Sequence, residues 1–414
     1  MTRDRRTGQN SLTLLQSGCV LYALTVPFET VVPKWLPTTL QGNLSITRIA
    51  GLYAIMTFAL SCQSLVLEFP AFIKCCAMFA VAICLTSMVS GAIELDLLSQ
   101  QVQGIMSCVV IYNACRASRF TIKAVLVAVG VSAAFCGMLT IGGYTVDTMY
   151  ADELGGRISA FGSDPNIFGG MIAVAVVCLV GAGDEDEWRS KLLLGICAVG
   201  YVVATSVIVS TSSRGATLSL VIGSLTLIKG IRKRIQYAPL LVCVGVLLLA
   251  NSGEVRRFVG ETLLSDRILA TIEDGESSGR VDIWNECVHM IAERPLVGWG
   301  SDAWLELGKR TGTITSEVRS PHNNWLTVAV YSGLIGLTVY GVMMYMVIKG
   351  AVRAWFCDRV TPMAVLLTIL SQDMLCGFFP GKMHYLCYAL VIAISGRAPR
   401  FRVLPRPTSA ELAA

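Results

Sequence analysis

Arg214, Arg280 and His322 are three polar residues that lie beside long apolar segments of this chain. An arginine guanidinium is a planar fork of hydrogen-bond donors that suits a phosphate, and a histidine can take up a proton near neutral pH. Two such forks and a base could bind a phosphate leaving group and deprotonate a hydroxyl that attacks the carbon bearing it. Their predicted location on one side of the membrane therefore raises the hypothesis of group transfer with a phosphate leaving group.

Each of the three residues also has a simpler interpretation. Arg214, in STSSRGATLSL, can extend its side chain from a helix end to the membrane surface. Arg280 can be a solvated charge near acidic neighbours, and His322 can be an interfacial side chain. The predicted orientation places Arg214 on the external face, where positive charge is disfavoured, and this favours a functional role.

The segment around Arg280, ESSGRVDIWNECVHMIAERPLVGWG, predicts an amphipathic helix. Ser277 or Ser278 can cap its start, Asp282 suits its first turn, and Pro295 ends it. A helix start presents free backbone amides to an anion, so Arg280 would reinforce a phosphate site. The apolar residues at helical spacing allow the helix to lie on the membrane surface; they are Ile283, Cys287, Val288 and Ile291.

Composition identifies the elements that must position these residues. The chain is 54% hydrophobic and only 15% charged, which is typical of a protein embedded in a lipid bilayer. We predict an all-α polytopic membrane protein with about twelve transmembrane helices, most of them long enough to cross the hydrocarbon layer. The expected spans are 12–33, 45–67, 71–93, 97–114, 120–142, 165–182, 191–210, 214–230, 236–251, 324–348, 361–379 and 383–396.

Basic segments alternate along the chain and predict its orientation. Under the twelve-span count, RASRFTIK, KGIRKRIQ and KGAVRAWFCDR share one side with both termini, which should therefore be cytoplasmic. The opposite, periplasmic side receives one large loop, residues 252–323, which carries the predicted helix. The expected divisions are N-terminal helices in 1–251, this loop, C-terminal helices in 324–396, and a cytoplasmic tail, 397–414.

Other residues are candidates for weaker roles on the same face. Trp284 and Trp299 could stack on sugars, although tryptophans also anchor helices at the membrane interface. Asn323 could hold His322 or cap the following helix. His384, in GKMHY, is a rival base without an accompanying arginine. Possible contacts to the site or to a sugar are also expected from Arg157, Asp164 and Asn166.

The motifs around these residues resemble those of bacterial O-antigen ligases and polymerases. His322-Asn323, nine residues and then Gly333-Leu334-Ile335-Gly336 is similar to the histidine motif of the ligases. GRVDIW...ERPLVGWG, SSRGA and FGSDPNIFGG are also similar to segments of this superfamily. The resemblance implies a GT-C-like glycosyltransferase of the bacterial inner membrane, with its active site in the periplasm and neither cofactor nor metal.

By this resemblance, Arg214 and Arg280 match diphosphate-binding arginines and His322 matches the base. The donor would be an undecaprenyl-diphosphate-linked glycan and the acceptor a hydroxyl of the lipid A core, with membrane lipids and no nucleic acid as further partners. An O-antigen or exopolysaccharide polymerase and a protein O-oligosaccharyltransferase remain open, as does the choice between lipopolysaccharide and exopolysaccharide biosynthesis. A lipid-linked glycan transporter is a different class, but the chain shows no related halves.

Overall fold

The computed structural model describes residues 2–28, 45–62, 65–89, 94–144, 160, 164–183, 191–231, 280–312, 321–375 and 381–397. Every element within these ranges is a helix. Before the expected loop these are α1 (Thr2–Thr25), the 3-10 turn η1 (Val26–Phe28), α3 (Ile46–Ser61), α4 (Ala71–Val89), α5 (Leu95–Ala117), α6 (Arg119–Ile141), α8 (Pro165–Gly181), α9 (Lys191–Thr211) and α10 (Arg214–Ile231). After it come α14 (Arg280–Glu293), η3 (Gly300–Asp302), α15 (Ala303–Arg310), α16 (Asn324–Phe356), α17 (Thr361–Leu375) and α18 (Lys382–Gly396).

These helices coincide with the expected membrane segments wherever the chain is described. The ninth expected segment, 236–251, lies outside the described residues. Among the described helices, α4, α6 and α16 are able to cross a membrane by length and composition, and six shorter apolar helices accompany them. The described part of the chain is therefore all-helical, with apolar helices of membrane type. The total of twelve crossings and the membrane orientation stay predictions.

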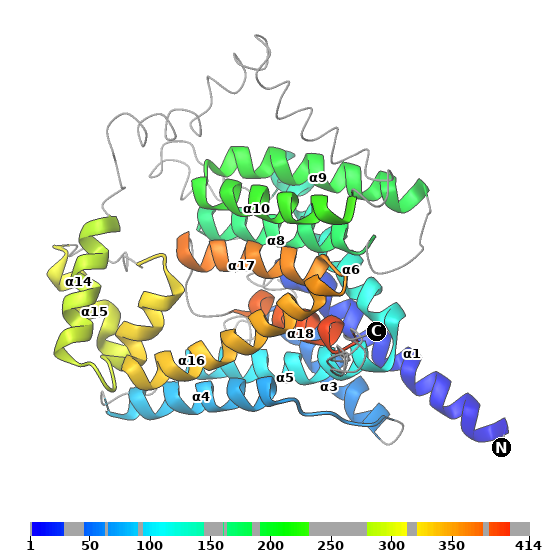
Figure 1. The fold of residues 1–414 in the computed structure, drawn as a ribbon, viewed down its shortest axis with the longest axis horizontal. Helices are drawn as coiled ribbons and strands as arrows, with labels where there is room; N and C mark the ends of the chain where they lie inside the picture. The colour runs from blue at the N-terminus through cyan, green and yellow to red at the C-terminus, as the bar shows by residue number, and fades with distance from the viewer. Residues whose placement is uncertain are drawn as a thin grey trace, which may run out of the picture.

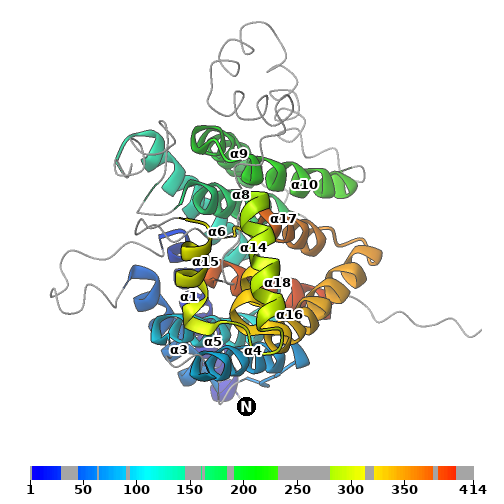
Figure 2. The same ribbon diagram turned by 90° about the vertical axis from the view of Figure 1, so that its left-hand side faces the viewer.

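The long helices lie side by side as a bundle, and α14 and α15 cross one of its ends (Figures 1 and 2). α18 is buried within the bundle and packs most extensively against α5. The hydroxyl of Tyr385 donates to Oε1 of Gln101, and the thiol of Cys108 donates to the carbonyl of Tyr385 at 3.1 Å. Polar and apolar contacts thus fix the central helix against its neighbour.

Several helix bounds differ from the hydropathy prediction. The helix α3 ends at Ser61, although its expected span continues to residue 67. The helix α16 continues to Phe356, beyond the expected end of its span at residue 348. Ala351 and Ala354 in this extension are fully buried, so packing on one face continues after the apolar run has ended. The helix α1 begins at Thr2, ahead of the apolar run that starts at residue 12.

Candidate functional site

Arg214 is the first residue of α10, at the corner that joins α10 to α9. Ser213 caps this helix start, since its hydroxyl accepts from the backbone N–H of Ala216 at 3.3 Å. The preceding Ser212 has φ 51°, a left-handed conformation that non-glycine residues adopt at some cost. The corner therefore holds a half-buried arginine at a helix start, where backbone amides also point outward.

The start of α8 supports this corner. Asp164 caps α8 by accepting from the backbone N–H of Asn166 at 2.7 Å and of Ile167 at 3.4 Å. A Cβ on Gly169 would come 3.0 Å from the Cβ of Ala216. The segment FGSDPNIFGG thus brings α8 close to the start of α10, with the buried Asn166 beside the cap. Asp164 acts there as a helix cap, and a direct role for Asp164 or Asn166 toward a ligand stays a prediction.

Two side chains of α14 tie this helix to other parts of the site. Nη1 of Arg280 donates to the carbonyl of Leu375, at the end of α17, at 2.7 Å. Nε1 of Trp284 donates to the carbonyl of Pro321, the residue before His322, at 2.8 Å. α14 therefore connects the end of α17 to the segment that carries His322. Since a guanidinium has five N–H donors, Arg280 can keep this bond and still present donors to an anion.

His322 lies directly before α16, half-buried and with φ 50°. Its Nδ1 is shielded from solvent. Asn323 caps α16 by accepting from the backbone N–H of Trp325 at 3.0 Å and of Leu326 at 3.2 Å. Asn324 turns the other way, and its amide donates to Oδ1 of Asp373 at 2.5 Å. Asn323 is thus the helix cap, one of the two roles expected for it, whereas Asn324 enters a buried polar network.

Asp373 is the centre of that network and was not among the predicted site residues. Its side chain is fully buried near the end of α17. Oδ1 faces Nε2 of His384 at 3.0 Å as well as Asn324, and Oδ2 accepts from the hydroxyls of Tyr340 and Tyr388, each at 3.4 Å. An acidic residue inside an apolar segment was a usable signal, because such residues are costly in a membrane and are retained for function.

His384 has both ring nitrogens engaged within the protein. Nδ1 accepts from the backbone N–H of Gly381 at 3.2 Å, so in the neutral ring Nε2 carries the proton and donates to Asp373. This arrangement leaves His384 without a nitrogen lone pair for an incoming hydroxyl. The geometry accordingly favours a positioning role for His384 over the role of base.

The loop that follows α14 is hydrogen-bonded to the first part of α16. The backbone N–H of Trp299 donates to the carbonyl of Val330 at 2.9 Å, and those of Leu334 and Ile335 donate to the carbonyls of Pro295 and Leu296 at 2.7 Å and 3.2 Å. These bonds are possible because α16 is interrupted at Gly333, which has φ 60° and ψ −161°. The short helical segment between His322 and Gly333 is thereby attached to the loop.

Arg310 joins α14 to α15 through three carboxylates. It forms a bidentate pair with Glu293, both bonds at 2.7 Å, and also contacts Glu306 at 2.8 Å and Glu286 at 3.2 Å. The hydrogen bonds from Arg310 lower the pKa of Glu293 and of Glu306, and those carboxylates, Glu293 first, raise the pKa of Arg310. We refer to these four residues as the Arg310 cluster.

Trp299 is buried between this cluster and α14. Its Nε1 donates to the carbonyl of Met290 at 2.8 Å, and the guanidinium carbons of Arg294 and Arg310 lie 4.0 Å and 5.1 Å from the centre of its ring system. These contacts give Trp299 a structural role. Sugar stacking by Trp299, or by the half-buried Trp284, stays a prediction.

The apolar residues of α14 differ in their exposure, and the location of this helix on the membrane surface stays a prediction. Ile283 and Cys287 are buried, and burial raises the pKa of the Cys287 thiol to about 12. Val288 is instead 57% exposed, so it does not belong to the face that packs on the protein. The helix ends at Glu293, just before Pro295, as expected. Arg157 and the proposed caps Ser277 and Ser278 lie outside the described residues.

Contacts among α14, α17 and the start of α16 connect Arg280 to the surroundings of His322. Arg280 reaches α17 beside Asp373, and Asp373 holds Asn324, which lies two residues after His322. The side chains of Ser371 and Ser219 link α17 to α10 at 2.8 Å, which brings in the helix that begins with Arg214. Among the described residues, His, Cys, Asp and Glu form no group of three or more that could hold a metal.

A comparison with protein families gave a match that covers part of this site. Residues 199–341 match the family described as O-antigen ligase. This segment of the chain is similar to O-antigen ligases. A comparison with curated proteins gave no significant match.

The O-antigen ligase match includes all three residues from which the functional hypothesis began. Arg214, Arg280 and His322 lie between residues 199 and 341, as do the loop after α14 and the break at Gly333. The resemblance to the O-antigen ligase and polymerase superfamily is therefore confirmed. It supports an enzyme of lipid-linked glycan processing. Asp373 and His384 lie beyond the matched residues.

Proposed function

We propose that this protein is an O-antigen ligase-type glycosyltransferase of the bacterial inner membrane. It moves a glycan from undecaprenyl diphosphate to a hydroxyl of the lipid A core at the periplasmic face. The observation that carries this proposal is the family match over a segment that includes Arg214, Arg280 and His322, in which Trp284 of α14 also bonds to Pro321, the residue before His322.

The arginines bind the diphosphate of the donor in this mechanism. Cleavage of the sugar–phosphate bond releases a diphosphate, and the negative charge that develops on it must be stabilised in the transition state. Guanidinium groups do so with paired, charge-assisted hydrogen bonds. The bond from Arg280 to the Leu375 carbonyl supports this role because it fixes the orientation of one fork before the donor arrives.

His322 takes the proton of the acceptor hydroxyl as the oxygen forms its bond to the sugar carbon. The bond between that carbon and the diphosphate oxygen breaks, and undecaprenyl diphosphate leaves with both electrons. The left-handed backbone at His322 and the Asn323 cap hold the ring beside the start of α16. Asn324 and Asp373 position the same segment from within the bundle.

Transfer by the purified protein tests the proposal. The full chain in lipid vesicles would be given an undecaprenyl-diphosphate-linked glycan and a lipid A core acceptor, and the glycosylated acceptor would be measured by mass spectrometry. Formation of the glycosylated core supports a ligase. Longer lipid-linked glycans as the sole product would indicate a polymerase, glycosylated serine or threonine a protein oligosaccharyltransferase, and movement of an intact donor between leaflets a transporter.

Deletion of the gene separates the first two activities in the cell. A ligase deletion should remove long chains from lipopolysaccharide while polymer accumulates on undecaprenyl diphosphate. A polymerase deletion should instead leave the core capped by single repeats, a result that would contradict the ligase proposal.

A further inference from the structure

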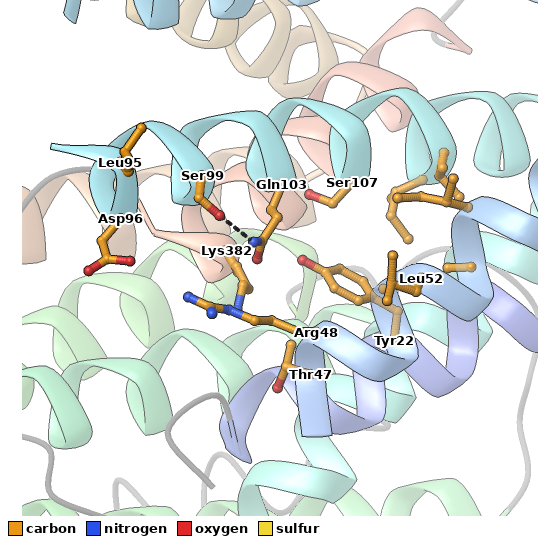
Figure 3. Close-up of a pocket in the computed structure, with 15 residues that line it drawn as sticks. Tyr22, Thr47, Arg48, Leu52, Leu95, Asp96, Ser99, Gln103, Ser107 and Lys382 are labelled. Carbon is orange, nitrogen blue, oxygen red and sulfur yellow. Dashed lines mark hydrogen bonds between the residues drawn. The ribbon is translucent and has the colours of Figure 1, made fainter. Parts of the chain in front are cut away.

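A cavity of about 390 Å³ lies between α1, α3, α5 and the start of α18, and no candidate residue discussed above lines it. Figure 3 shows its polar residues around the space beneath α5, with Arg48 and Lys382 projecting into the same region. The residues that line it on α5 extend from Leu95 to Ile111, a rise of about 24 Å at 1.5 Å per residue. The cavity is therefore elongated along a helix.

The character of the cavity wall changes along its length. Arg48, Lys382, Asp96 and Ser99 lie near the helix ends where α3, α18 and α5 begin. Farther along α3 and α5, apolar side chains dominate the wall, among them Leu52, Ile55, Val110 and Ile111. A site that is charged at one end and apolar along its length has the polarity of a membrane lipid, with its headgroup at the charged end.

The charged end is suited to an anion. Lys382 is only 3% exposed and Arg48 is half-buried, whereas Asp96 is the single acidic residue in the described cavity wall. Lysine and arginine side chains form charge-assisted hydrogen bonds with phosphate oxygens. Lys382 is also the first residue of α18, so backbone N–H groups of that helix start face the same region.

Gln103 adds a group that can recognise a sugar hydroxyl. Its Nε2 donates to Oγ of Ser99 at 2.9 Å, while its Oε1 is buried and has no hydrogen-bond partner among the described residues. An unpaired buried acceptor costs free energy that a ligand hydroxyl would recover. The two basic residues and this acceptor together fit a phosphorylated sugar.

One short segment of the chain joins the cavity wall to the candidate active site. Lys382 is two residues before His384, whose ring contacts Asp373 at 3.0 Å. Asp373 in turn holds Asn324, two residues after His322. A headgroup at Lys382 would thus lie across this network from the residue assigned as base.

We propose that the cavity binds the phosphorylated sugar headgroup of the acceptor glycolipid, with an acyl chain along α5. This inference rests on the proposed ligase function and assigns the second substrate to a site of its own. Arg48 and Lys382 hold the acceptor phosphate and Gln103 accepts from a sugar hydroxyl, while Arg214 and Arg280 hold the donor diphosphate.

Binding measurements on the full-length protein in detergent test this assignment without requiring transfer. The two probes are lipid A, which is a phosphorylated disaccharide lipid, and undecaprenyl diphosphate. Lys382→Gln and Arg48→Gln should each raise the dissociation constant for lipid A about tenfold, equivalent to roughly 1.4 kcal/mol, and leave that for undecaprenyl diphosphate unchanged. Arg280→Lys should show the reverse pattern.

Controls distinguish a specific site from general effects. Lys74→Gln makes the same change at an exposed position on α4 and should bind both probes as the wild type does. Lys382→Arg keeps the charge and should recover most of the lipid A affinity, which guards against a folding defect in Lys382→Gln. Phosphatidylglycerol and inorganic phosphate, added as competitors, should displace lipid A poorly.

Three results would overturn the assignment. Unchanged lipid A affinity in both Lys382→Gln and Arg48→Gln would show that the cavity does not bind this headgroup. Equal competition by phosphatidylglycerol would identify a site for ordinary membrane lipid, and equal competition by inorganic phosphate an anion site without sugar recognition. If lipid A binds as expected but no transfer occurs, the failure lies with the proposed function and not with the site.

Discussion

Gly298 and Gly333 approach each other so closely that neither has room for a side chain. A Cβ on Gly298 would lie 2.6 Å from the backbone nitrogen of Gly333, and a Cβ on Gly333 would lie 2.7 Å from that of Gly298. Both residues have positive φ, 68° and 60°. This contact joins the loop after α14 to the break in α16, and so gives a physical reason for a glycine at the end of the histidine motif.

Gly333→Ala should therefore destabilise the protein and reduce transfer. The new Cβ would lie 2.4 Å from the carbonyl of Leu296, and the left-handed backbone adds a cost of about 1–3 kcal/mol. Gly341→Ala is the matched control on the same helix, where a Cβ meets nothing within 4 Å. That variant should be neutral or slightly stabilising, because alanine favours helix. Thermal unfolding in detergent compares the two, and equal midpoints would contradict this account.

The Arg310 cluster should make the packing of α14 on α15 sensitive to acid. The folded-state pKa of Glu293 and of Glu306 is lowered from the usual 4.5, chiefly by hydrogen bonds from Arg310. Their contribution to stability is therefore present above the usual pKa and is lost as pH falls through the lowered folded value. Unfolding midpoints measured between about pH 6 and pH 3 should fall more steeply for the wild type than for Glu293→Gln.

Asp302→Asn provides the control for this pH dependence. Asp302 is exposed and lies outside the Arg310 cluster, so its variant should follow the wild-type curve. A Glu293→Gln curve parallel to that of the wild type would show that the ion pairs contribute nothing to the acid response.

Hydropathy was sufficient to predict the described helices of the bundle. It did not predict the polar network inside them. Each expected segment in the described chain is a helix because bilayer-length apolar runs have few other structures. Arg280 and His322 were chosen as site candidates because charged or titratable residues beside such runs are unusual, and their roles stay predictions. Their separation in sequence, however, gave no indication that Arg280 contacts Leu375 or that Trp284 contacts Pro321.

Asp373 and the cavity beside Lys382 are features that depend on how the helices pack together and that the sequence analysis did not predict. The pairing of Asp373 with Asn324 and His384 joins three helices or helix ends, and no periodicity within one helix encodes it. Helical spacing placed Ile283, Cys287 and Val288 on one apolar face, but it could not tell which of them the protein buries.

Asp373→Asn should lower both stability and transfer. The carboxylate accepts four hydrogen bonds from Asn324, His384, Tyr340 and Tyr388, and an amide would turn an N–H toward two of these donors. Loss of such buried bonds costs about 1–3 kcal/mol and should displace the segment that carries His322. His384→Ala should retain more activity, because the other three donors remain. Abolished transfer by His384→Ala at an unchanged unfolding midpoint would instead identify His384 as the base.

Topology reporters test the orientation on which the mechanism depends. A reporter fused after Gly312, just beyond α15, should be active only in the periplasm, and one fused after Asp358, between α16 and α17, only in the cytoplasm. The reason is the retention of basic loops on the cytoplasmic side. A cytoplasmic signal at Gly312 would place Arg280 and His322 in the wrong compartment and remove the active-site assignment.

The roles of the arginines and of His322 can be separated by kinetics. Arg214→Lys and Arg280→Lys keep the charge but lose the fork, so both donor binding and turnover should be impaired. For Arg280 the loss is sharper, because a lysine that bonds the Leu375 carbonyl has no planar fork left for the diphosphate. His322→Ala should leave donor binding nearly intact and lower kcat by roughly a hundredfold or more, the usual scale for loss of a general base.

Arg353→Lys is the control for these variants. Arg353 lies in the last turn of α16, far along the chain from His322, so this variant should transfer as the wild type does. Donor affinity and transfer rate would be measured on the same purified samples. If His322→Ala transfers at nearly the wild-type rate and His384→Ala is inactive, the base would be His384, which contacts Asp373. Full activity in both Arg214→Lys and Arg280→Lys would show that paired hydrogen bonds to the diphosphate are not required, and the proposed mechanism would then have to be abandoned.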